Sequence, residues 1–259
     1  NCFVMTYTTN QLMRKPVMEQ AMRDLARAIR FVRKNASEYN VDADKICICG
    51  FSAAGHVCAS VCDYWSEISD ENPSYKDISC RPDAAVLSYP VITSGEYAHQ
   101  GSFCNLLGAD IYERTDDEAK ALLNRYSLEK NVKSDNPPCF IWQTEADDLV
   151  PVENSYLYAD ACKKAGVKYE HITFPNGPHG LSIPTDEWAR GMHGEPYTAE
   201  QSFALVKAIK EGVIEAPENG AESLLDYLKP WPYDPNGPKF PEVCVWPDLA
   251  DNFIRKVFA

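Results

Sequence analysis

The sequence predicts an α/β fold in which a mostly parallel sheet is flanked by helices. Runs of residues typical of buried strands recur at 2–8, 45–51, 83–89, 139–144 and 168–174. Helical patterns separate most of these runs, and strands joined through helices form right-handed crossovers into a parallel sheet. The chain has 259 residues and 45% hydrophobic content, enough for one large core. We therefore expect a single domain over residues 1–259.

The first elements follow from the spacing of apolar residues. Residues 2–8, CFVMTYT, are strand-like. Pro16 is expected to open a helix, because its fixed φ suits the first helical position. The apolar residues that follow recur with the 3.6-residue helical period. They are Val17, Ala21, Leu25, Ala28, Ile29 and Val32. The run KICICGF at 45–51 is the next strand, and a helix follows it over 52–65.

The later elements alternate in the same way. After the strand at 83–89 comes an excursion over 95–138, a candidate lid or cap, with a helix expected to start near Asp116. The strand CFIWQT leads into a helix over 152–165 that Gly166 ends, since glycine adopts the left-handed conformation common after a helix. We expect loops over 184–199 and over the proline-rich 230–241.

Composition excludes several classes of partner. The formal net charge is −13, and the resulting negative field repels phosphates. No apolar run approaches the roughly 18 residues of a membrane span. We expect a small neutral substrate, no nucleic acid and no membrane, while a homo-oligomer stays open.

The ten cysteines are placed like core residues. Cys47 and Cys49 alternate with isoleucines in one strand, and Cys58 and Cys62 stand one helical turn apart. A zinc site instead needs paired Cys/His clusters at short spacing. We therefore expect no metal and no cofactor, and reduced thiols of the kind found in cytoplasmic proteins.

The stretch GFSAAGH places Ser52 on the turn between the strand at 45–51 and the helix at 52–65. A nucleophile on such a tight turn takes strained backbone angles and needs small neighbours, which the glycines and alanines of the stretch supply. The turn points the serine hydroxyl to solvent and leaves the amide of Ala53 free to stabilise an oxyanion. The alternative is that Ser52 only caps the helix.

A serine hydroxyl needs a base that takes its proton and a carboxylate that orients this base. His179 fits best, because it lies in FPNGPHGL directly after the last strand, in a loop that can place the ring over the sheet edge. His56 belongs to the helix of the nucleophile, and His171 lies inside a strand. His99 and His193 lie in loops without supporting context.

The acid is expected after the preceding strand, where EADDLVP follows CFIWQT. Asp147 lies three residues past Thr144, far enough to clear the strand end. Asp148 is the runner-up, and its other role would be to cap the next helix. Glu145 is the third candidate. The order serine, acid, histidine is that of α/β hydrolases and not that of chymotrypsin or subtilisin.

The chain resembles the α/β-hydrolase carbohydrate esterases known as acetyl esterases or xylan esterases. The matching stretches are GFSAAGH, SFCNLLG, PPCFIWQTEADDLVPVENSY, FPNGPHGL and VWPDLADNFI. The resemblance implies an α/β-hydrolase fold and a cofactor-free serine esterase for short acyl esters, mainly acetyl groups on plant-derived oligosaccharides. It also selects Asp147, because the acid of the family motif stands four residues before the proline.

Two departures from the family pattern stand out. Relatives commonly have G-F-S-A-G-G-H at the turn, where this chain has Ala54 in place of the second glycine; we expect the turn to tolerate the added methyl group. The glycine-rich loop that provides the other half of the oxyanion hole does not occur. Residues 2–8 resemble the strand after that loop. We therefore expect the first N-terminal strands to be missing, and to lie upstream, in another polypeptide, or to be replaced by rearrangement.

The expected chemistry is acyl transfer through a Ser-His-Asp triad. Ser52 attacks the ester carbonyl, His179 takes its proton and later gives it to the leaving sugar oxygen, Asp147 orients the imidazole and the Ala53 amide stabilises the oxyanion. Two alternatives remain: a serine peptidase of the prolyl-oligopeptidase type, which shares the fold and the order of the triad, and a non-catalytic hydrolase relative that serves as a binding module.

Overall fold

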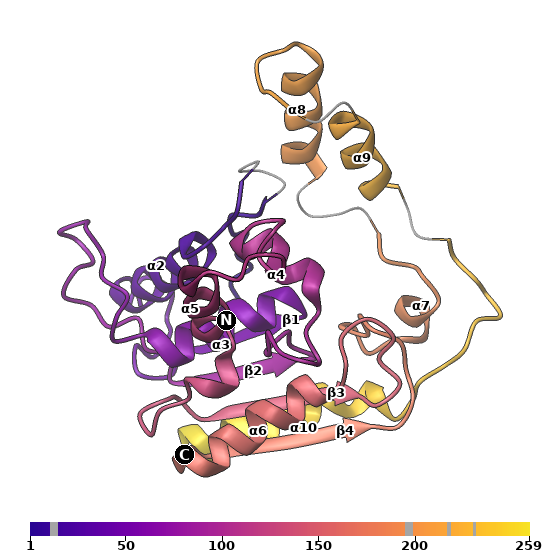
Figure 1. Ribbon diagram of the computed structural model, residues 1–259. Helices are drawn as coiled ribbons and strands as arrows, with labels where there is room; N and C mark the ends of the chain where they lie inside the picture. The colour runs from indigo at the N-terminus through magenta and orange to yellow at the C-terminus, as the bar shows by residue number, and fades with distance from the viewer. Residues whose placement is uncertain (11–14, 195–198, 217–218, 230–231) are drawn as a thin grey trace.

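The computed structural model describes residues 1–10, 15–194, 199–216, 219–229 and 232–259 (Figure 1). Its centre is a parallel sheet with the strand order β1-β2-β3-β4. The strands are β1 (Cys47–Phe51), β2 (Ala84–Ser88), β3 (Cys139–Thr144) and β4 (Tyr169–Phe174). Each lies within a predicted run, so the parallel sheet built through helical connections is confirmed.

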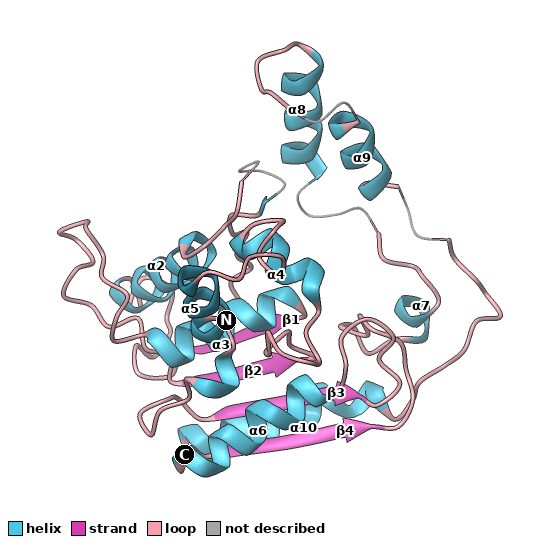
Figure 2. Cartoon of the chain, viewed as in Figure 1, coloured by secondary structure: helices cyan, strands magenta, loops and turns pink. Residues whose placement is uncertain are grey.

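Helices connect and cover these strands (Figure 2). They are α2 (Gln20–Lys34), α3 (Ala53–Tyr64), α4 (Gln100–Leu107), α5 (Asp117–Arg125), α6 (Glu153–Ala165), α7 (Asp186–Ala189), α8 (Ala199–Lys210), α9 (Gly220–Tyr227) and α10 (Trp246–Phe258), with short 3₁₀ turns at Leu128–Lys130 and Val243–Val245. The helices expected over 52–65, 152–165 and after Asp116 are confirmed. Gly166 ends α6 with a φ of 75°, and Asp116 caps α5 by accepting a hydrogen bond from Ala119 N.

The sheet is covered on both faces. Every residue of β2 and β3 is buried, as expected for central strands of a parallel sheet. On one face, Leu87 and Ile141 pack in a cluster with residues of α2, α3 and α6. On the other face, Phe140 and Trp142 pack against α10. The result is a three-layer arrangement of helix, sheet and helix.

The prediction of a strand over residues 2–8 is wrong. This segment is neither helix nor strand and joins no strand of the described sheet, and the side chains of Phe3 and Val4 are 45% and 72% exposed. Thr8 N donates instead to the Asp24 carboxylate. Strand-like composition reflects fit to a pleated, half-buried surface, and without a neighbouring strand the backbone gains no ladder.

The helix expected from Pro16 begins four residues later, at Gln20. Met18 has a φ of 50°, and its amide donates to the carbonyl of Leu106 in α4. This contact holds the turn before α2 in a non-helical conformation. The buried face of α2 consequently runs through Ala21, Met22, Ala26, Ile29 and Arg30.

The cysteine prediction holds for α3 and fails for β1. Cys58 and Cys62 are buried, whereas Cys47 is half-buried and Cys49 is exposed. The difference arises because β1 is the first strand in the order of the sheet and pairs with β2 alone. All ten cysteines are free thiols.

The loops after β4 contain more helix than predicted. Within 184–199, α7 interrupts the expected loop, and residues 195–198 lie outside the described part of the chain. Of the proline-rich segment, 230–231 also lie outside it, and 232–241 carry no helix or strand. Helices α8 and α9 pack against each other through Leu205, Val206 and Leu224 and extend away from the sheet (Figure 1).

Candidate active site

Ser52 stands on a strained turn between β1 and α3. Its φ of 55° and ψ of −118° are rare for a residue with a side chain. The Ser52 amide donates to Ser88 O at 3.0 Å, and its carbonyl accepts from Val91 N, so the end of β2 holds the turn on both sides. Among the described residues, the Ser52 side chain makes no capping hydrogen bond to α3. The hydroxyl is thus available for another partner.

Two glycines allow this turn to close. A methyl group on Gly50 would lie 2.7 Å from Cys58 Sγ, and one on Gly55 would lie 2.8 Å from Pro90 Cβ. The first distance is shorter than a carbon–sulfur van der Waals contact, and the second is shorter than a carbon–carbon contact. Ala54, the residue in place of the usual glycine, is half-buried inside α3, so the turn accommodates its methyl group.

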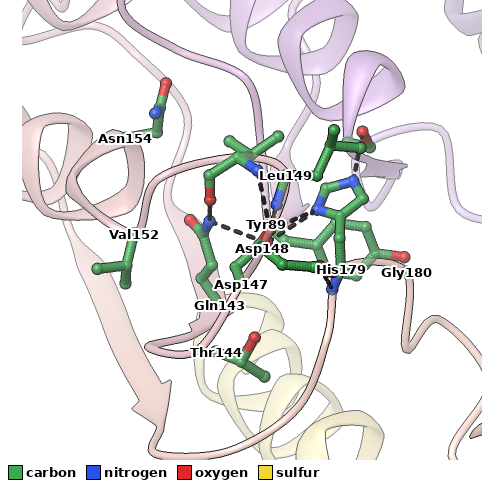
Figure 3. A network of polar contacts seen from close by, with 12 residues as sticks. Tyr89, Gln143, Thr144, Asp147, Asp148, Leu149, Val152, Asn154, His179 and Gly180 are labelled. Atoms are coloured by element: carbon green, nitrogen blue, oxygen red, sulfur yellow. Dashed lines mark hydrogen bonds and ion pairs between the residues drawn. The ribbon is translucent and has the colours of Figure 1, made fainter. Parts of the chain in front are cut away.

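The three residues predicted as a triad lie in one hydrogen-bonded line. Ser52 Oγ is 2.8 Å from His179 Nε2. His179 Nδ1 is 2.8 Å from Asp147 Oδ2 and 3.1 Å from Oδ1 (Figure 3). They come from the segments that follow β1, β4 and β3, at the carboxyl edge of the sheet. The His179 side chain is 12% exposed and that of Asp147 is fully buried, so solvent reaches this line mainly from the serine side.

The Asp147 carboxylate has further donors (Figure 3). Its Oδ1 accepts from the amides of Leu149 and Val150 at 3.0 and 2.8 Å. Its Oδ2 accepts from Gln143 Nε2 at 3.1 Å. These bonds fix the direction in which the carboxylate faces the imidazole.

Sequence reasoning missed Gln143. This side chain is fully buried in β3 and also donates to Val150 O at 2.7 Å. A polar residue in the otherwise apolar run CFIWQT was the available signal, since a buried amide needs hydrogen-bond partners. Its side chain ties the Asp147 loop to the sheet.

The other two acid candidates have different partners. Asp148 Oδ1 accepts from the backbone amide of His179 at 3.1 Å, so it contacts the histidine loop and not the ring. Glu145 Oε1 accepts from Tyr156 Oη and Thr173 Oγ1. The choice of Asp147 over Asp148 therefore agrees with the geometry.

Tyr89 and Trp188 brace the loop that carries His179. The Tyr89 ring packs edge-on against the imidazole with a centroid distance of 4.8 Å, and its hydroxyl lies 2.6 Å from Ser182 Oγ. Trp188 Nε1 donates to Gly180 O at 2.8 Å. Tyr89 has a φ of 37°, a second strained residue at the strand ends. These contacts, which the sequence did not reveal, restrict the positions of the imidazole.

The remaining histidines have other partners. Nδ1 of His56 lies 3.0 Å from Val91 O, and burial lowers the pKa of this imidazole to about 4. His99 caps α4, His171 contacts a serine of α6 and His193 packs beside a tryptophan ring. Burial also lowers the pKa of His99 and of His171.

The amide of Ala53 is placed to stabilise negative charge. As the first residue of α3, it has no acceptor one turn earlier in the helix. The partial positive charge at a helix N-terminus adds to this effect. Ala53 is an exposed residue and directly follows Ser52 in the chain.

Two features are absent from the described residues. These residues contain no group of three or more His, Cys, Asp or Glu side chains arranged to hold a metal ion. None of the described helices combines the length and apolar character needed to cross a bilayer.

The chain is similar in sequence to one family model and to several known proteins. Residues 3–161 match the sequence model of the family described as BD-FAE. The chain is 50% identical over 203 residues to endo-1,4-beta-xylanase B of Butyrivibrio fibrisolvens, an alignment that covers 78% of this chain and 31% of that protein. It is 33% identical over 165 residues to the acetylxylan esterase of Xylanibacter ruminicola, covering 62% and 31% of the two chains. The chain thus spans about a third of the length of these relatives.

Among solved structures, the chain is similar to the acetyl ester-xyloside bifunctional hydrolase of Caldicellulosiruptor lactoaceticus. The sequence identity is 38%, the TM-score is 0.58, and the alignment covers 76% of this chain and 67% of the other. The predicted α/β-hydrolase fold and the resemblance to carbohydrate esterases are confirmed.

Proposed function

Because this chain belongs to the BD-FAE family of α/β-hydrolase esterases, we propose that it is a serine esterase for short acyl esters, mainly acetyl groups on plant-derived oligosaccharides. The observation that carries the proposal is the line from Ser52 Oγ through His179 to Asp147, with a distance of 2.8 Å at each step. The substrate class is supported by the names of two relatives, an acetylxylan esterase and an acetyl ester-xyloside hydrolase.

The reaction follows from this geometry. His179 Nε2 accepts the Ser52 hydroxyl proton while Oγ attacks the ester carbonyl carbon. The carbonyl oxygen becomes an oxyanion, and the Ala53 amide at the start of α3 donates to it. His179 then gives the proton to the leaving alcohol oxygen, and an acyl-enzyme remains. Water deacylates Ser52 by the same steps, with His179 again as the base.

Asp147 orients the imidazole in this scheme. Its contact with Nδ1 holds the tautomer in which Nε2 is unprotonated, and its negative charge stabilises the imidazolium that forms during attack. The donors from Gln143, Leu149 and Val150 keep the carboxylate in place.

The first test uses a fluorophosphonate probe, which reacts with activated serines, on the complete gene product. We expect the natural protein to be labelled and Ser52→Ala to be unlabelled. Ser52→Ala should also lose about 10⁶-fold in kcat on nitrophenyl acetate, since removal of a nucleophile abolishes the covalent route. A natural protein that folds but takes no label would contradict the proposal and favour a non-catalytic binding module.

Substrate profiling separates the esterase from a peptidase. We expect release of acetate from acetylated xylo-oligosaccharides and turnover of nitrophenyl acetate, without cleavage of dipeptide amides. Efficient amide cleavage would instead favour a peptidase of the prolyl-oligopeptidase type. If one site performs both reactions, Ser52→Ala should lose the release of acetate and the turnover of nitrophenyl acetate together.

A further inference from the structure

A pocket with a volume of about 300 Å³ lies beside Ala53, the residue that follows the proposed nucleophile. Its walls come from residues 7–10, from the chain at the start of α2, from the first turns of α3 and from α4. The apolar side chains that line it include Val57, Val91, Phe103 and Leu106. Ala53 and Val57 stand four residues apart on α3, so they share one face of the helix.

The geometry of ester cleavage decides which part of a substrate this pocket can hold. The leaving alcohol oxygen must lie within hydrogen-bond reach of His179 Nε2, which protonates it. The carbonyl oxygen must lie at the Ala53 amide. The acyl chain of the substrate therefore begins next to Ala53 and extends away from the imidazole. The lining of the pocket includes Ala53 and further residues of α3 and α4, and none of the described residues that line it belongs to the loop that carries His179.

The volume of the pocket exceeds what an acetyl group requires, and its wall has the character that suits a longer alkyl chain. A water molecule occupies about 30 Å³ in the liquid, whereas the pocket has about 300 Å³. His56 also lines it. Burial lowers the pKa of this imidazole to about 4, so this part of the wall is uncharged at neutral pH. A neutral, largely apolar wall suits an alkyl chain.

We propose that this pocket is the acyl subsite and that it accepts unbranched acyl chains of about four to six carbons as well as acetyl. The inference rests on the proposed function, because it needs Ser52 to accept the acyl group. Longer chains gain by burying methylene groups against Val57 and Leu106. The pocket would then set the acyl specificity, while the alcohol side of the ester lies near His179.

The test compares nitrophenyl acetate, butyrate, hexanoate and octanoate as substrates of the complete gene product. We expect kcat/KM for butyrate and hexanoate to equal or exceed that for acetate. Val57→Trp fills the pocket next to Ala53 and should lower the ratio of hexanoate to acetate by at least about tenfold, since each methylene excluded from an apolar site costs about that much. Leu106→Ala removes most of a lining side chain on α4, which enlarges the pocket and should shift the preference toward octanoate.

Val213→Trp is the matched control, because it makes the same substitution at a valine that is 74% exposed and does not line the pocket. Its profile should equal that of the natural protein. An unchanged profile in both pocket variants would overturn the assignment, as would a natural protein that prefers acetate to butyrate by more than tenfold. Failure to hydrolyse any of the four esters would instead contradict the proposed function itself.

Discussion

Ser52 shows how much a few residues can specify. Small neighbours on a strand-to-helix turn predicted a strained, exposed serine. The positive φ of Ser52 confirms the strain, and the close contacts at Gly50 and Gly55 explain why these two positions need glycine. The stretch GFSAAGH alone could not show whether the Ser52 hydroxyl caps the helix or forms a hydrogen bond with a base. That choice depends on His179, which lies 127 positions away in the chain.

Asp147 and Asp148 are adjacent in the chain and allow a matched comparison. Asp147→Asn should lower kcat on nitrophenyl acetate by about 10⁴-fold, because an amide in this place favours the wrong imidazole tautomer. Asp148→Asn keeps an oxygen that can accept from the His179 amide and should lower kcat by less than about tenfold. Steady-state kinetics with both purified variants is the measurement.

The pH-rate profile provides a second readout for this pair. Asp148→Asn should keep the profile of the natural protein, since the ring of His179 retains its carboxylate partner. If kcat fell equally in Asp147→Asn and Asp148→Asn, or fell more in Asp148→Asn, Asp147 would not be the orienting acid.

At the scale of elements, α3 is anchored to α6 through a buried carboxyl group. Asp63, near the end of α3, is 1% exposed. Its Oδ1 accepts from Asn136 Nδ2 at 2.6 Å and from Tyr158 Oη at 2.9 Å. Its Oδ2 has no hydrogen-bond partner among the described residues. Burial raises the pKa of Asp63 from 3.8 to about 8, against the opposing effect of its two donors.

This shift predicts a pH-dependent stability. Between pH 3.8 and about 8, the unfolded chain releases the Asp63 proton while the folded protein retains it. The unfolded state therefore binds fewer protons, and the free energy of unfolding contributed by this group falls as pH rises through that window. Asp63→Asn removes the contribution. The stability of this variant relative to the natural protein should rise from pH 5 to pH 8, measured by urea unfolding.

Asp251→Asn serves as the control, because its side chain on α10 is 55% exposed and pairs with Arg255. Its stability relative to the natural protein should change little between the two pH values. A relative stability of Asp63→Asn that is independent of pH would mean that Asp63 is ionised in the folded state.

At the scale of the whole molecule, α10 covers one face of the sheet. It lies about 100 residues after β3 in the chain, yet Trp246 stacks on Trp142 with a centroid distance of 5.2 Å and an interplanar angle of 18°. Phe253 is fully buried and packs near Phe140. The helix covers the sheet face opposite α3, so the turn at Ser52 is supported from both layers.

Phe253→Ala should lower the free energy of unfolding by about 3–5 kcal/mol, because it removes a large buried side chain and leaves a cavity. Denaturant unfolding followed by fluorescence is the measurement. Phe203→Ala makes the same change at a side chain that is 51% exposed and should cost less than about 1 kcal/mol. Equal losses would contradict the placement of α10 on the sheet.

Local patterns predicted four strands, the helices after β1 and β3, and the residues that form the Ser52, His179 and Asp147 line. These features depend on side-chain period, turn chemistry and the order of elements, all of which are read along the chain. The strand expected at 2–8 failed because pairing depends on a neighbour. Helices α4, α7, α8, α9 and α10 were not predicted.

The sequence by itself determined the fold class and the three residues of the Ser52, His179 and Asp147 line, because a parallel sheet gathers the loops after its strands at one edge. Only the tertiary structure decided that Gln143 and Tyr89 hold Asp147 and His179 in place, and that a pocket lies beside Ala53. Each of these depends on distances between segments far apart in the chain, which packing alone establishes.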